Sequence, residues 1–96
     1  MSEDFDKAVE KVRALLEGQE LEGSFRFEIA EEGVIMIRDG AVSTEDGEAE
    51  VTVRSDLETF RGMFGGELSA TTAFMTGRVE VEGDVGVAMR LSALLE

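Results

Sequence analysis

The chain has 96 residues, enough for one compact domain and too few for two. It contains no Cys, His, Trp, Tyr or Pro, which excludes disulfides, thiolate and imidazole metal ligands, and cysteine or histidine catalysis. Twenty-two acidic residues against nine basic ones give a formal net charge of −13. A field of that sign repels nucleic acid and anionic membrane surfaces, so neither is an expected partner.

No apolar run reaches 18 residues, and the sequence begins with the acidic segment 1–4. We therefore expect neither a membrane-spanning helix nor a secretory signal peptide. These features predict a cytoplasmic protein with no stable membrane insertion.

The first expected element is an amphipathic helix over residues 2–17. Its apolar stripe consists of Phe5, Val9, Val12, Leu15 and Leu16. From Ser24 the apolar period changes to two, and four strands are expected at 25–29, 34–37, 41–44 and 49–54. Short turns, two of them Asp-Gly, separate these strands. This spacing predicts an antiparallel meander rather than βαβ units.

The second half of the chain alternates between helix and strand signals. Ser55 and Glu58 form a predicted capping box for a helix that ends near Gly65. Ser69 is expected to cap a further short helix. Val79 and Val81 then alternate with charged residues in a fifth strand. The last helix follows it, and its apolar residues cover well over half of its circumference.

The residues that could support catalysis or metal binding are poorly placed for it. The acidic residues fall on wet strand positions, helix exteriors and turns, as solvated charges do. The segment 45–50 is acidic but lacks the spacing of an EF-hand loop. No Lys-Ser or Lys-Thr follows the glycines at 62–66, and no His is available to activate a serine. We therefore expect no enzyme activity, no metal and no cofactor.

Large apolar side chains crowd into the segment 60–75. They are Phe60, Met63, Phe64, Leu68, Phe74 and Met75. Such residues either form ordinary core or line a deformable pocket, because Met repacks at small cost around varied ligands. We predict that Phe74→Asp unfolds the domain. Met63→Asp or Met89→Asp is expected to impair binding more than folding.

The segment 66–91, GELSATTAFMTGRVEVEGDVGVAMRL, resembles the C-terminal hallmark of sterol carrier protein 2 (SCP2-type) domains. The match lies in the spacing of Gly-x-Leu, Ala-Phe-Met-x-Gly, an alternating strand, Gly-Asp and Ala-Met-x-Leu. Upstream, residues 49–64 resemble the family's strand and following helix. The resemblance extends over nearly the whole chain.

The resemblance implies a fold and a function. The fold is α/β (α+β), a five-stranded, mostly antiparallel sheet with all helices packed on one face, in a single domain over residues 1–96. The implied function is non-catalytic binding of a fatty acid, fatty acyl-CoA, isoprenoid or sterol-like lipid in an apolar tunnel between sheet and helices. Residues implied to line the tunnel are Phe60, Met63, Phe64, Leu68, Phe74, Met75, Met89, Leu91 and Leu94.

An alternative function stays open at this point. The wide apolar arc of the last helix could form a homodimer or dock a partner, so that the domain acts as a protein-interaction or accessory module. A monomer and a homodimer are both compatible with the sequence. Two residues depart from the family's pattern, since Glu67 and Ala70 stand where many members have Lys and Pro. Glu67 reverses the sign of a basic contact.

Overall fold

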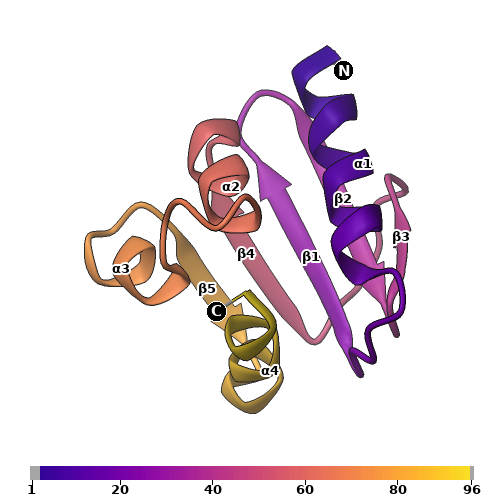
Figure 1. The fold of residues 1–96 in the computed structure, drawn as a ribbon. Helices are drawn as coiled ribbons and strands as arrows, with labels where there is room; N and C mark the ends of the chain where they lie inside the picture. The colour runs from indigo at the N-terminus through magenta and orange to yellow at the C-terminus, as the bar shows by residue number, and fades with distance from the viewer. Residues whose placement is uncertain (1–2, 96) are drawn as a thin grey trace.

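The computed structural model describes residues 3–95 and consists of one five-stranded sheet and four helices (Figure 1). The elements are α1 (Glu3–Leu16), β1 (Ser24–Ile29), β2 (Gly33–Arg38), β3 (Ala41–Ser43), β4 (Val51–Ser55), α2 (Leu57–Phe64), α3 (Ala70–Met75), β5 (Glu80–Gly83) and α4 (Val85–Leu95). All five predicted strands and all four predicted helices are present. The predicted start of the first helix at residue 2 lies outside the described residues.

The strand order is β3-β2-β1-β4-β5. Three of the four pairings are antiparallel, which confirms the mostly antiparallel sheet. The pairing of β1 with β4 is parallel, with Phe27 opposite Val53, so the prediction of a simple meander is wrong. The reason is the connection 44–50, which carries the chain from β3 past β2 and β1 to the far side of β1. Short connections alone did not indicate this crossing.

The four helices lie on the same face of the sheet (Figure 1). Inward strand residues such as Phe25, Phe27 and Ile29 are buried against this helical layer, and α1 contributes Phe5 and Val12 to the same core. The alternation of apolar and polar residues in β1 and β4 therefore places one face of the sheet in the core.

The opposite face of the sheet carries a chain of ion pairs. Arg26 lies between Asp46 and Glu28, at 2.6 and 2.8 Å, and Arg54 lies between Glu28 and Glu82, at 3.3 and 2.9 Å. The hydrogen bond from Arg26 lowers the pKa of Asp46 and that of Glu28 below their usual values. The network ties the crossing segment, β1, β4 and β5 together.

Helix α2 begins at a different residue from the one predicted. Its N-cap is Asp56, whose carboxylate accepts a hydrogen bond of 2.7 Å from the backbone N–H of Thr59. Ser55 instead ends β4, and its hydroxyl donates to the carbonyl of Asp56. The strand continues one residue further than expected and moves the cap along by one position.

We expect Asp56→Ala to lower the free energy of unfolding by about 1 kcal/mol at neutral pH, since it removes the N-cap. The hydrogen bond from the Thr59 N–H lowers the folded-state pKa of Asp56. A lowered pKa means that the carboxylate stabilises the fold above its unfolded pKa and loses this effect as the pH falls through the folded pKa. The free energies of unfolding of wild type and variant, measured in urea, should therefore differ at neutral pH and converge in acid, below the folded-state pKa of Asp56. A constant difference would contradict this account.

Candidate functional site

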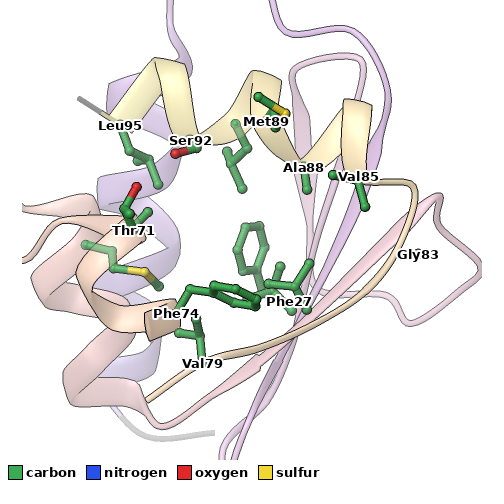
Figure 2. Close-up of a pocket in the computed structure, with 15 residues that line it drawn as sticks. Phe27, Thr71, Phe74, Val79, Gly83, Val85, Ala88, Met89, Ser92 and Leu95 are labelled. Carbon is green, nitrogen blue, oxygen red and sulfur yellow. The ribbon is translucent and has the colours of Figure 1, made fainter. Parts of the chain in front are cut away.

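A pocket of about 300 Å³ lies between the β1, β4 and β5 side of the sheet and the helices α2, α3 and α4 (Figure 2). Its lining consists of Phe27, Val53, Met63, Ala70, Thr71, Phe74, Val79, Val81, Gly83, Val85, Ala88, Met89, Leu91, Ser92 and Leu95. All of these except Thr71 and Ser92 have apolar side chains or none.

The pocket has a buried floor and an exposed rim. The floor is formed by five buried residues, Phe27, Val53, Met63, Val79 and Leu91. On the rim, large apolar side chains face water: Phe74 is 58% exposed, Met89 66% and Val85 70%. Exposed apolar side chains gathered around one opening are typical of binding surfaces.

Local sequence explains why β5 and α4 supply so much of this lining. Val79, Val81 and Gly83 alternate with Arg78, Glu80 and Glu82, so every second position faces the helices. In α4 the lining residues recur at helical spacing along one side, which Figure 2 shows for Val85, Ala88, Met89, Ser92 and Leu95.

The start of α4 is fixed by a side-chain cap. Asp84 Oδ1 accepts a hydrogen bond of 3.1 Å from the N–H of Val87, and the Asp84 N–H donates to the carbonyl of Glu50 at 2.9 Å. Val87 and Leu91 are the buried residues of α4 and attach it to the core. The cap and these two side chains hold the helix over the edge of the sheet, where it closes one side of the pocket.

The structure brings four of the nine predicted site residues into the pocket: Met63, Phe74, Met89 and Leu91. Phe60 and Phe64 lie in the core instead, where both rings pack edge-on against Phe27, at centroid distances of 5.2 and 5.5 Å. They support the pocket floor without lining it.

The other three predicted residues also lie outside the lining. Leu68 and Leu94 are partly buried and pack against the core, and Met75 is 79% exposed. Helical geometry explains Met75, because it is adjacent to Phe74 in α3 and adjacent residues project about 100° apart. Ala73 is the residue of α3 that is buried, and Phe74 lines the pocket while staying largely exposed.

Sequence reasoning missed all of the strand contributions to the pocket. Phe27, Val53, Val79 and Val81 line it from the β1, β4 and β5 side, and the small residues Ala70 and Ala88 make room for it. The period-two alternation at 79–83 was a usable signal for the β5 residues. Nothing local distinguishes Phe27 from its neighbours Phe25 and Ile29, which are buried in the core.

Neither a membrane-spanning helix nor a metal-binding cluster is found in residues 3–95. Among them, no helix is long and apolar enough to cross a membrane. The same part of the chain contains no group of three or more His, Cys, Asp or Glu side chains placed to hold a metal ion.

We expect Met63→Asp to unfold the domain and Phe74→Asp to leave it folded, the reverse of the order that the sequence suggests. Met63 is 4% exposed, so an Asp there buries a carboxylate without a partner, at a cost of several kcal/mol. Phe74 is mostly exposed, and its Asp replacement stays hydrated. Thermal melts followed by circular dichroism measure both. Loss of the folded signal in Phe74→Asp would show that this ring is structural.

The fold and the pocket together define a class: a small α+β domain in which an apolar pocket separates part of a one-sided sheet from its helices. Comparison with known proteins makes the assignment specific. The SCP-2 sterol transfer family matches residues 5–96, and the chain belongs to this family. The resemblance seen in the sequence is thereby confirmed.

Two vertebrate proteins illustrate how the chain relates to longer ones. Hydroxysteroid dehydrogenase-like protein 2 of Danio rerio is 37% identical over 82 residues, and the match covers 77% of this chain and 20% of that protein. The protein of the same name in Xenopus laevis is 38% identical over 47 residues, covering 49% of this chain and 11% of its own length. The chain thus spans a fifth or less of the length of these relatives.

Solved structures confirm the fold. Sterol carrier protein 2 like 2 of Aedes aegypti superposes with a TM-score of 0.80 at 22% identity, covering 94% of each chain. Sterol carrier protein 2 of the same mosquito, solved in complex with palmitate, gives 0.79 at 22% identity over 99% of this chain and 96% of that one. A ubiquinone synthesis protein, UbiJ-SCP2, gives 0.60 at 21% identity over 92% and 74%.

Proposed function

We propose that this domain binds a lipid non-covalently, with its hydrocarbon chain in the pocket between sheet and helices. The observation that carries the proposal is the pocket itself, which has a volume of about 300 Å³. Apart from Thr71 and Ser92, its described lining side chains are apolar. Membership of the SCP-2 sterol transfer family supports it, as does the palmitate complex of a mosquito protein with the same fold. Among the predicted site residues, Met63, Phe74, Met89 and Leu91 are proposed to contact the chain.

The proposed mechanism is passive. Transfer of hydrocarbon from water into the pocket contributes about 0.8 kcal/mol per buried methylene, and no bond is made or broken. The flexible thioethers of Met63 and Met89 allow the walls to adjust to different chains. We propose no catalytic residue, no metal and no cofactor. The single domain over residues 1–96 and a cytoplasmic location remain predictions.

A chain-length series tests the proposal. For straight-chain alcohols from 1-hexanol to 1-decanol, affinity should rise about fourfold per added methylene, as expected from the transfer free energy of a buried methylene. Displacement of the uncharged dye Nile red from the protein measures each affinity. Affinities that do not change with chain length, or no displacement at the solubility limit of 1-decanol, would show that the pocket does not bury hydrocarbon.

One observation favours a second function, docking of a second copy of this chain through α4. Val85 and Met89 are both about two-thirds exposed and lie on the same side of the helix. An exposed apolar helix face of this kind is common in homodimer interfaces. Light scattering with and without 1-decanol separates the two functions. A dimer that persists when ligand fills the pocket supports docking, and a monomer under both conditions contradicts it.

A further inference from the structure

Among the described residues, two polar side chains line the pocket, and both are hydroxyls. They are Thr71 on α3 and Ser92 on α4. Figure 2 places both toward the end of the pocket where Leu95 lies, while Val85 and Gly83 lie toward the other end. Within residues 3–95, neither hydroxyl has a hydrogen-bond partner, so both remain available to a ligand. Ser92 is half-buried and Thr71 is exposed, so this end of the pocket is also open to water.

No charged side chain of the described residues lines the pocket. Four arginines adjoin a lining residue in the sequence, and none of them lines the pocket. Arg78 and Arg90 are exposed. Arg26 and Arg54 are engaged on the opposite face of the sheet. A carboxylate or phosphate head at the opening would therefore lose hydration without gaining a cation, and it would enter the field of a protein with net charge −13.

An uncharged hydroxyl head fits this arrangement better than an anion. A hydroxyl donates one hydrogen bond and accepts two, so an alcohol head can either donate to or accept from each of these side chains. The pocket volume lies at the lower end of the range for small-molecule sites, about 300–1,000 Å³, which favours one hydrocarbon chain over two.

We propose that the pocket selects uncharged, hydroxyl-bearing single-chain lipids over carboxylates of the same length, through Thr71 and Ser92 at its opening. This inference rests on the proposed function and adds the class of ligand head to it. The negative net charge of the chain and the absence of a cation among the described lining residues both disfavour binding of a carboxylate head.

The first experiment compares 1-decanol with decanoate by Nile red displacement at neutral pH and low ionic strength. The alcohol should bind at least tenfold more tightly. Added sodium chloride should raise the affinity for decanoate several-fold and leave that for 1-decanol unchanged, because salt screens only the charged ligand from the protein field.

The second experiment moves a cation into the opening. Ser92→Lys should remove the preference for the alcohol or reverse it. The matched control is Ser43→Lys, which changes the net charge equally but lies on β3, at the opposite edge of the sheet. The control should keep at least a fivefold preference. The double variant Thr71→Val, Ser92→Ala should bind 1-decanol about tenfold more weakly than the wild type, as expected for two lost hydrogen bonds.

The outcomes separate the two proposals. If 1-decanol and decanoate bind equally, or decanoate binds more tightly, the inference about the head is wrong and the proposed function stands. If both lysine variants shift the preference equally, the selection comes from net charge and the hydroxyls play no part, which also overturns the inference. If neither ligand displaces the dye, the proposed function itself fails.

Discussion

The Ala88→Trp variant is expected to fold like the wild type and to bind straight-chain alcohols about two-hundredfold more weakly. Ala88 lines the pocket from α4, and Figure 2 shows its methyl group directed into the pocket. An indole at this position occupies space that the ligand chain would otherwise use. Exclusion of about four methylenes at 0.8 kcal/mol each corresponds to this loss in affinity.

The control for this variant lies on the same helix. Ala93 is exposed and outside the lining, so Ala93→Trp adds the same side chain to α4 without entering the pocket. Its affinity for 1-decanol should match that of the wild type within a factor of about two. Calorimetric titration gives both affinities, and thermal melts check that both variants are folded. Equal affinities for the two variants would place the ligand elsewhere.

Gly83→Ala is expected to lower the melting temperature by more than about 10 °C. Gly83 ends β5 at a φ of +120°, where side chains are strained. A Cβ there would also overlap the carbonyl oxygen of Glu50 and approach the Cα of Val51 to 3.0 Å. Because these are backbone atoms, β5 would have to separate from β4. A loss of roughly 2–3 kcal/mol gives a shift of this size in a domain of this length.

Two other glycines separate the effect of backbone strain from the effect of steric overlap. Gly77 has a φ of +76°, and a methyl group added to it would have nothing within 4 Å, so Gly77→Ala introduces strain without overlap. Gly47 has open space and no positive φ, so Gly47→Ala should be neutral or slightly stabilising. Differential scanning calorimetry should give the order Gly83, Gly77, Gly47 in decreasing loss. Equal losses at Gly83 and Gly77 would show that backbone contact with Glu50 does not matter.

Much of the fold was predictable because the signals were local. The change from helical to period-two spacing near Ser24 and the glycines after each of the first three helices indicated the nine elements. The parallel neighbour of β1 was not predictable in this way. The segment 44–50 is acidic and has no regular structure, and its course depends on the pairing of Asp46 with Arg26 across 20 residues.

The site was predictable only in part, because a cluster in sequence is not a cluster in space. Phe60, Met63 and Phe64 share one face of α2, yet of these three only Met63 reaches the pocket, since the two rings fill the space above Phe27. Thr71 and Ser92 are far apart in the sequence and carry no motif. Only the approach of α3 to α4 brings both to one pocket.

The lining has a consequence for ligand exchange. With the exception of Phe27, every lining residue belongs to the segment 53–95, and α4 is attached through Asp84, Val87 and Leu91. Detachment of this one helix would open the pocket while α1 and the central strands stay intact, a local opening that costs less than global unfolding. For the proposed lipid, the rate of release is then expected to depend on how firmly α4 is attached, and not on the stability of the rest of the domain.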